Sequence, residues 1–186
     1  MNPNPLPPFK LERYFARWEF SAPYLLCTSD IQGLALRDLL TLADPETLSL
    51  WDNLSLGYTE TTGHPLLREE ITHLYQQVSA EEVLGFAGAE EAIYIAQRVL
   101  LQPGDHMIVT FPGYQSSYSV AEAMGVEVSR WTLTTESGVD GRITWKADPG
   151  ELRRLLRPNT RLVLVNFPHN PTGALPSLAE WKEIVG

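Results

Sequence analysis

Cysteine is nearly absent from this chain of 186 residues, in which Cys27 is the only one. A single cysteine cannot form an intramolecular disulfide, and it cannot supply a cysteine-rich metal site. The chain also has no apolar run near the roughly 18 to 20 residues that a membrane-spanning helix needs. Its first ten residues lack the charged and then apolar pattern of a signal peptide. These absences predict a cytoplasmic protein that does not enter a membrane.

Positive charge is also scarce, with 14 Lys and Arg residues against 23 Asp and Glu residues and a formal net charge of −9. The basic residues are scattered, apart from Arg153, Arg154 and Arg157, so nucleic acid is not an expected partner. The four histidines show no metal-ligand spacing, and no metal site is predicted. Neither G-x-G-x-x-G after the first strand nor G-x-x-x-x-G-K-[ST] occurs, which argues against a nucleotide-binding domain.

Hydrophobic periodicity divides the chain into two parts. The first nine residues carry four prolines and predict an extended arm, and helical patterning follows at residues 9–18, 34–43 and 63–77. Further along, strands are expected at 83–87, 106–111, 126–133 and 161–167, alternating with helices at 89–101, 115–124, 149–156 and 176–185. Strands separated by helices of this length predict a parallel sheet with crossover helices, so the fold class is α/β.

Three of the predicted strands end in segments rich in glycine or polar residues. They are GFAGA at 85–89, FPGY at 111–114 and NFPHNPTG at 166–173. Ligands of parallel α/β sheets bind beyond the carboxyl ends of the strands. The three segments are therefore the candidate binding site.

Each segment has both a functional and an ordinary structural interpretation. The free N–H groups of Gly88, Ala89 and Glu90 at a helix start form a cradle for a phosphate, but a glycine in a strand-to-helix turn needs no ligand. Tyr114 can lie flat against a planar heterocycle, or it can cap the core. Asn170 can reach a ligand oxygen with its amide, or it can belong to an Asx-Pro turn.

Taken together, the segments resemble the class I/II aminotransferase family of fold-type I pyridoxal phosphate (PLP) enzymes. The resemblance extends from about Tyr58 to the last residue. The matching stretches are LGYTETTGHPLLREEI, GFAGAEEAI, LLQPGDHMIVTFPGYQSSY and LVLVNFPHNPTG. It implies a three-layer sandwich with a mostly parallel sheet, as part of the large domain of that fold.

By this resemblance the cofactor is pyridoxal 5′-phosphate, and the residues that bind it are Gly88, Ala89, Glu90, Tyr114, Asn170 and Tyr58. The first three correspond to the phosphate-binding turn. Tyr114 is similar to the aromatic residue that stacks on the pyridine ring, and Asn170 to the asparagine that hydrogen-bonds its phenolic oxygen. Tyr58 is similar to the tyrosine that reaches the cofactor phosphate of the neighbouring subunit, which implies a homodimer with shared active sites. The resemblance also implies a cis peptide between Asn170 and Pro171.

The same resemblance predicts the domain organisation. Residues 1–45 are expected to form an N-terminal arm and a small-domain segment, and residues 46–186 an incomplete PLP-binding large domain. Two features depart from the family pattern. Ala87 stands where many relatives have a hydroxyl residue, and CTSDIQG does not give the usual glycine-rich substrate loop. The sequence of that segment is more similar to the branch that resembles capreomycidine synthase.

The chemistry of the family needs a lysine that holds the cofactor as a Schiff base and shuttles a proton. Only Lys10, Lys146 and Lys182 occur here, and none stands in the expected serine-rich motif, so each is interpreted as a surface residue. The acidic D-x-x-Y motif would begin beyond Gly186. We therefore expect an N-terminal fragment of a PLP-dependent aminotransferase that acts on an amino acid and a 2-oxo acid, with no catalytic residue in this chain. The alternative is a non-catalytic PLP-binding or dimerisation module.

Overall fold

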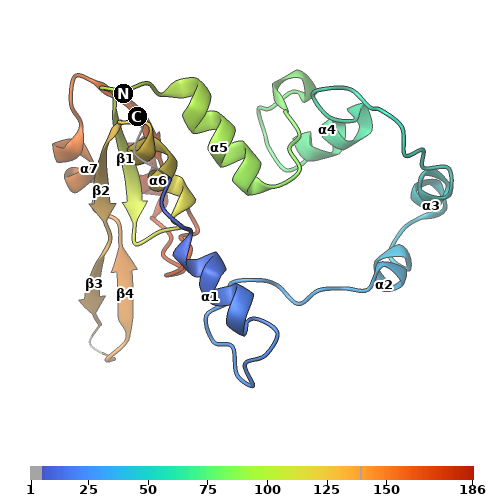
Figure 1. The fold of residues 1–186 in the computed structure, drawn as a ribbon, viewed down its shortest axis with the longest axis horizontal. Helices are drawn as coiled ribbons and strands as arrows, with labels where there is room; N and C mark the ends of the chain where they lie inside the picture. Colours follow the sequence, from blue (N-terminus) through green and yellow to red (C-terminus); the bar gives the residue numbers. More distant parts are fainter. Residues whose placement is uncertain (1–5, 139) are drawn as a thin grey trace. The chain divides into compact units, whose positions relative to one another are not determined.

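The computed structural model describes residues 6–138 and 140–186, which fall into two compact units. Among the described residues, the first unit combines 6–29 with 88–138 and 140–186 and contains the sheet, and the second comprises residues 30–87 and is helical (Figure 1). The domain boundary expected at residue 45 stays a prediction. None of the helices in the described residues is long and apolar enough to cross a membrane.

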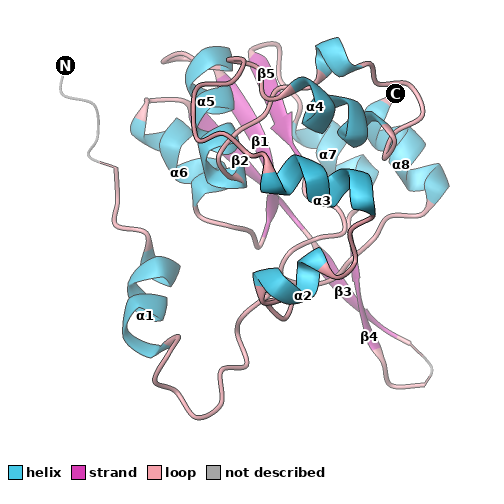
Figure 2. Ribbon diagram, turned by 90° about the vertical axis from the view of Figure 1, so that its right-hand side faces the viewer, coloured by secondary structure: helices cyan, strands magenta, loops and turns pink. Residues whose placement is uncertain are grey.

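Three parallel strands form the main sheet, in the order β2–β1–β5 (Figure 2). The central strand β1 (His106–Phe111) pairs with β2 (Glu127–Thr132) on one side and with β5 (Thr160–Leu164) on the other. Its sequence HMIVTF lacks an apolar and polar alternation, which is typical of a strand covered on both faces. The structure confirms the predicted strand 106–111 and buries all of it except the partly exposed Phe111.

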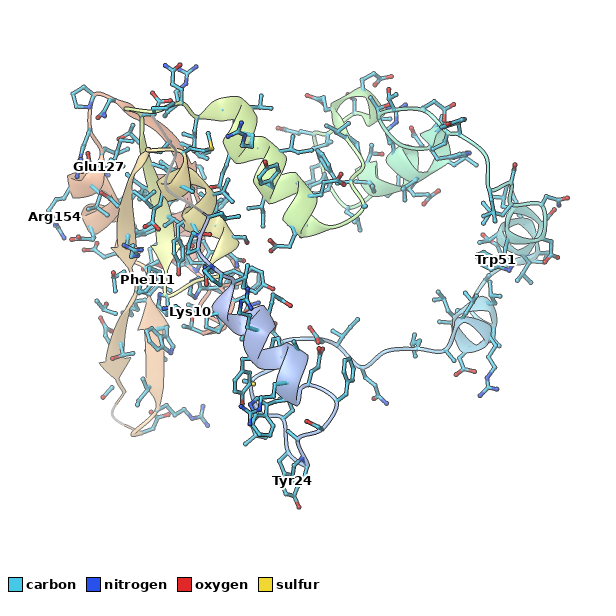
Figure 3. The ribbon with its side chains drawn as sticks, in the orientation of Figure 1. Lys10, Tyr24, Trp51, Phe111, Glu127 and Arg154 are labelled. Carbon is cyan, nitrogen blue, oxygen red and sulfur yellow. The ribbon has the colours of Figure 1, made fainter. Side chains whose placement is uncertain are left out.

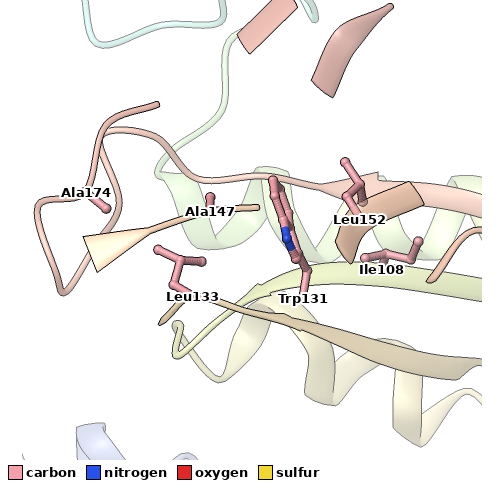
Figure 4. Close-up of a cluster of buried hydrophobic side chains, with 6 residues drawn as sticks. All are labelled: Ile108, Trp131, Leu133, Ala147, Leu152 and Ala174. Carbon is pink, nitrogen blue, oxygen red and sulfur yellow. The ribbon is translucent and has the colours of Figure 1, made fainter. Parts of the chain in front are cut away.

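Side chains of β1 alternate between two hydrophobic clusters on opposite faces of the sheet. Ile108 belongs to the first cluster, which consists of Ile108, Trp131, Leu133, Ala147, Leu152 and Ala174 (Figure 4). Met107 and Val109 belong to the second, together with Ala121 of α6 (Ser116–Ala123). Because Leu152 lies on α7 (Pro149–Leu155), helices cover both faces, and the predicted three-layer α/β fold is confirmed. Burial of each large side chain stabilises the fold by roughly 1.5–3 kcal/mol.

A buried glutamine joins α5 (Ala89–Leu100) to α6. The side chain of Gln97 is fully buried. Its Nε2 donates to the Ser116 carbonyl at 2.8 Å, and its Oε1 accepts from the Ala121 N–H at 3.0 Å. Since both partners are backbone groups, Gln97 fixes the position of α5 against α6 with little freedom.

His106 organises the amino-terminal edge of the sheet. The ring is buried, with Nδ1 at 2.7 Å from Thr160 Oγ1 on β5 and Nε2 at 2.8 Å from Ser129 Oγ on β2. The side chain therefore bridges all three strands. Burial lowers the pKa of His106 first, and the nearby Arg157 guanidinium lowers it further, while Glu127 opposes both effects.

An antiparallel hairpin lies between the predicted strand 126–133 and the predicted helix 149–156, where no helix or strand was expected. Its strands are β3 (Thr134–Ser137) and β4 (Ile143–Lys146). All of their residues are exposed, so the hydrophobic signal for a strand is weak here. The prediction overlooked the β-branched and aromatic residues in TT and ITW, which favour strands without burial.

The second unit contains α2 (Leu36–Leu40), α3 (Pro45–Asp52), α4 (Pro65–Thr72) and the short 3-10 helix η1 (Ala80–Glu82). Helices were predicted at 34–43 and 63–77, and both are shorter in the structure. Helix α3 was not predicted, although its start is well marked. Asp44 caps it by accepting the Thr47 N–H at 2.7 Å, and Pro45 occupies the first turn.

The predicted strand at 83–87 is wrong. The segment is extended but has no neighbouring strand among the described residues, and a strand requires a partner for its backbone groups. It is fixed instead by the Gly85 N–H, which donates to the Thr62 carbonyl at 2.8 Å. Gly63 has a φ of +105°, a backbone conformation that residues with a side chain rarely adopt. A glycine is therefore required at position 63.

The remaining helices of the first unit agree with the predicted ranges to within about two residues. They are α1 (Lys10–Trp18), α5, α6, α7 and α8 (Leu178–Val185). The last strand, β5, ends at Leu164, earlier than the predicted residue 167, so the segment from Val165 onward is already loop.

We predict that Gln97→Leu lowers the free energy of unfolding by roughly 1–3 kcal/mol. The change removes the hydrogen bonds that link Gln97 on α5 to the Ser116 carbonyl and the Ala121 N–H of α6, and each contributes about 0.5–1.5 kcal/mol. Urea denaturation followed by circular dichroism measures the effect. Arg98→Leu, at the exposed neighbouring position, is the control and should change stability by less than about 0.5 kcal/mol. Equal stability of the two variants would contradict this role of Gln97.

We also predict that stability falls as the pH drops below 6.5. Because the pKa of His106 is lowered in the folded state, the unfolded chain binds the proton more readily. The stabilisation is therefore complete above the ordinary pKa of 6.5 and is lost as pH falls toward the folded pKa. Denaturation at pH 7.5 and at pH 5.5 gives the free energy of unfolding at each pH. The difference between these two free energies should be smaller for His106→Gln than for the native chain. The exposed His73→Gln serves as the control, and an unchanged difference in His106→Gln would refute the assignment.

Candidate functional site

The carboxyl ends of β1 and β5 lie at one edge of the sheet, because the two strands are parallel neighbours. The loop after β1 carries Tyr114, and the loop after β5 carries Asn170. In Figure 1 the arrows of β1 and β2 point toward this edge, where α1 begins. Figure 3 shows the same relation through Phe111, at the end of β1, and Lys10, at the start of α1.

The start of α5 is tied to the same edge. Glu90 Oε1 accepts a hydrogen bond from Ser116 Oγ at 2.9 Å, only two residues beyond Tyr114. The N–H groups in the first turn of an α-helix have no acceptor within the helix. Gly88, Ala89 and Glu90 therefore present their amides beside the loop that follows β1, as the phosphate-cradle interpretation requires.

The backbone at Gly88 does not itself require glycine. Its φ is 179°, which is extended backbone that any residue adopts, and a Cβ at this position would meet no atom within 4 Å. The interpretation of Gly88 as a purely conformational glycine is thus unsupported. What glycine provides here is open space in front of the amides, which suits the close approach of an anion.

Tyr114 is held at the edge rather than packed in the core. It is half-buried and belongs to neither hydrophobic cluster, so the core-capping interpretation is not supported. Its hydroxyl donates to Glu12 Oε1 at 2.7 Å, and its ring centroid is 4.9 Å from that of Phe9 at an interplanar angle of 57°. The preceding Gly113 makes the turn possible, since a Cβ there would stand 2.8 Å from the Thr110 carbonyl oxygen.

Asn170 stands on a compact turn with its side chain exposed. The Gly173 N–H donates to the His169 carbonyl at 2.7 Å, and Gly173 has a φ of +71°. The Asn170–Pro171 peptide is cis, as expected. Asn170 Nδ2 donates to Ser29 Oγ at 3.1 Å, and because an amide NH₂ carries two N–H bonds, one donor stays available to a ligand.

His169 supports this turn from inside the protein. Its ring is 2% exposed, and Nδ1 lies 2.8 Å from Thr172 Oγ1. The Ala174 N–H donates to the same oxygen at 3.2 Å, so the Thr172 hydroxyl links the ring to the backbone of the turn. Within the described residues His169 Nε2 has no hydrogen-bond partner.

The charge state of His169 follows from this environment. Burial lowers the pKa of His169, while the backbone of Pro112 opposes the shift. The ring is therefore neutral at physiological pH. Since Pro112 belongs to the loop after β1, the His169 ring also lies between the two loops that carry Tyr114 and Asn170.

The N-terminal segment, by which we mean residues 6–29, is the part of the site that sequence reasoning missed. Glu12 and Tyr114 are 102 residues apart in the chain, and Ser29 and Asn170 are 141 residues apart. The sequence predicted a proline-rich arm and a helix but gave no signal for these contacts. A helix that docks through one carboxylate and one aromatic ring leaves no periodic pattern to detect.

Tyr58 lies in the second unit, with a side chain that is fully exposed. Across the described residues no group of three or more His, Cys, Asp or Glu side chains could hold a metal ion.

The three lysines differ in their surroundings, and only Lys146 forms an ion pair in the described part of the chain. Lys146 Nζ is 2.7 Å from Glu136 Oε2, and the hydrogen bond to this carboxylate raises the pKa of Lys146. A nucleophilic lysine needs the opposite shift. Lys10 and Lys182 are exposed on α1 and α8.

Comparison with known proteins agrees with this geometry. The sequence pattern of the family "Aminotransferase class I and II" matches residues 26–186. Arginine–pyruvate transaminase AruH of Pseudomonas aeruginosa is 32% identical over 161 residues, which cover 78% of this chain and 39% of that protein. Capreomycidine synthase of Streptomyces vinaceus is 32% identical over 174 residues, covering 92% of this chain and 43% of that protein.

A solved structure has the same fold. The crystal structure of a PLP-dependent aminotransferase from Streptococcus suis superimposes with a TM-score of 0.84 and 32% identity, and the match covers 97% of this chain and 48% of that one. The chain thus spans less than half the length of the relatives that it matches. On this evidence it belongs to the class I and II aminotransferase family of fold-type I enzymes, whose cofactor is pyridoxal 5′-phosphate.

Proposed function

We propose that this chain holds pyridoxal 5′-phosphate for an aminotransferase that exchanges the amino group of an amino acid with a 2-oxo acid. The observation that carries the proposal is the meeting of three segments at one sheet edge. The start of α5 is joined to the loop after β1 through Glu90 and Ser116. The loop after β5 leaves the sheet at the same edge, because β1 and β5 are parallel neighbours.

The residues at this edge fit the cofactor in their chemistry. The amides of Gly88, Ala89 and Glu90 suit its phosphate, because they combine free N–H donors with the positive end of the α5 dipole. Tyr114 offers a ring face for stacking, and the second N–H of the Asn170 amide suits the phenolic oxygen. When bound, the cofactor supplies an electron sink for chemistry at the substrate α-carbon.

The chain's own contribution is to bind and orient, and the proton-transferring amine comes from outside these 186 residues. The ion pair of Lys146 and the exposed positions of Lys10 and Lys182 support this. The chain alone is then inactive, as a fragment of a longer enzyme would be. The same placement of the lysines supports the alternative, a non-catalytic PLP-binding or dimerisation module.

We further propose a cytoplasmic homodimer with a shared active site, which acts in amino-acid biosynthesis without nucleic-acid or membrane partners. The full exposure of Tyr58 supports the shared site, since this side chain is available to a second subunit. The formal net charge of −9 argues against nucleic-acid binding. A single cysteine is compatible with a reducing compartment.

Gly88→Ala tests the phosphate cradle without disturbing the fold. The added methyl meets no atom within 4 Å, but it occupies the space in front of the amides. Loss of one hydrogen bond to a charged group costs roughly 1.5–3 kcal/mol, so PLP affinity should fall by about 10- to 100-fold. Quenching of tryptophan fluorescence by added PLP measures the affinity.

Gly33→Ala is the matched control for this change. A Cβ at position 33 also meets no atom within 4 Å, so both stability and PLP affinity should stay at the native level. Native PLP affinity in a folded Gly88→Ala variant would overturn the phosphate assignment.

Borohydride reduction tests the origin of the amine. The chain is incubated with equimolar PLP, reduced, digested and examined by mass spectrometry. We expect no stoichiometric phosphopyridoxyl adduct at Lys10, Lys146 or Lys182. A stoichiometric adduct at any one of them would contradict the proposal that the amine comes from outside this chain.

A further inference from the structure

We propose that Glu12 selects substrates whose side chain carries a positive charge, with a guanidinium group as the preferred partner. This inference rests on the function proposed above and names the substrate class of the same site. It follows from the position of the N-terminal segment, from the unbalanced charge of Glu12 and from the aromatic rings beside it.

The N-terminal segment touches both residues proposed to hold the cofactor ring. Near its start, Glu12 accepts the hydrogen bond from the Tyr114 hydroxyl at 2.7 Å. Further along, Ser29 accepts the hydrogen bond from Asn170 at 3.1 Å. The segment therefore lies beside the place proposed for the ring, where a substrate side chain can reach it.

The start of α1 is fixed to the loop after β1 by two side-chain hydrogen bonds. Gln115 Oε1 accepts the Lys10 backbone N–H at 3.1 Å, and Gln115 Nε2 donates to the Pro8 carbonyl at 3.1 Å. These reciprocal bonds anchor the chain on both sides of Phe9. Two residues further on, Glu12 is thus held at a defined distance from the loop after β1.

The charge of Glu12 has no partner of opposite sign in the described part of the chain. No Lys, Arg or His side chain forms an ion pair with it there. On a helix, side chains interact at spacings of three and four residues. The residues at those spacings are all uncharged, namely Pro8, Phe9, Phe15 and Ala16.

Lys10 and Arg13 stand close in sequence but not on the same face. They are two residues before and one residue after Glu12, and neighbours at these spacings do not face each other on a helix. The exposed carboxylate therefore attracts a cation from outside the chain. Tyr114 uses Oε1, and Oε2 is the oxygen left to accept a donor from a substrate.

The surroundings of Glu12 favour a planar cation. A guanidinium group donates in a fork that matches a carboxylate, and it also stacks on aromatic rings. The ring of Phe9, which stands three residues before Glu12 in the sequence and packs against Tyr114, offers such a surface. An anionic substrate side chain would instead meet repulsion at this position.

Reduced conjugates of PLP with amino acids test the inference without the missing lysine. We compare phosphopyridoxyl-L-arginine with phosphopyridoxyl-L-citrulline, which has nearly the same shape but no charge. The native chain should bind the arginine conjugate about fivefold more tightly, the ratio expected for an exposed ion pair. The preference should shrink as salt concentration rises.

In Glu12→Gln the ratio should fall to about one, with the affinity for the citrulline conjugate unchanged, because the glutamine oxygen still accepts the Tyr114 hydrogen bond. Glu19→Gln, at the far end of α1, is the matched control and should keep the native ratio. Equal binding of both conjugates by the native chain would overturn the role of Glu12 and leave the proposed cofactor site standing. Failure of both conjugates to bind would overturn the cofactor site itself, and the inference with it.

Discussion

The pairing of β1 with β5 is the constraint on which the rest of the structure depends. Met107, Ile108 and Val109 stand opposite Leu162, Val163 and Leu164 in parallel register. This register sends both strands to the same edge, where their loops carry Tyr114 and Asn170. Because the side chains of β1 are buried in two separate clusters, a shift by one residue would move each cluster to the wrong face and separate the two loops.

Two buried histidines act at opposite ends of this sheet. His106 bridges β2 and β5 at the amino-terminal edge, and His169 supports the turn of Asn170 at the other edge. Burial lowers the pKa of both, so both rings are neutral at physiological pH. The neutral state costs less in the interior than a charged one, and it lets the His106 ring use its nitrogens as one donor and one acceptor. A buried histidine ring thus stabilises the backbone at each of the two edges of the sheet, although the core between them is mostly apolar.

Much of the first unit could be predicted from the sequence, because its strands and helices carry strong hydrophobic periods. HMIVTF was predicted to the residue, and the helices nearly so. The strand at 83–87 failed because an extended segment becomes a strand only when a partner lies beside it, and a local pattern says nothing of partners. The hairpin at 134–146 failed for the opposite reason, since it pairs without burial. In the site, the family pattern pointed to Gly88, Tyr114 and Asn170, but the contacts of Glu12 and Ser29 depend on how the N-terminal segment docks, which no motif records.

The central claim is that one edge of the sheet grips the cofactor by its phosphate, its ring face and its phenolic oxygen. The most direct measurement is a ¹H–¹⁵N correlation spectrum of the labelled chain during titration with PLP. The account predicts that the backbone amide signals of Gly88, Ala89 and Glu90 move together with the side-chain amide of Asn170, at one common midpoint. Shifts confined to other residues, or separate midpoints for the α5 amides and for Asn170, would contradict it.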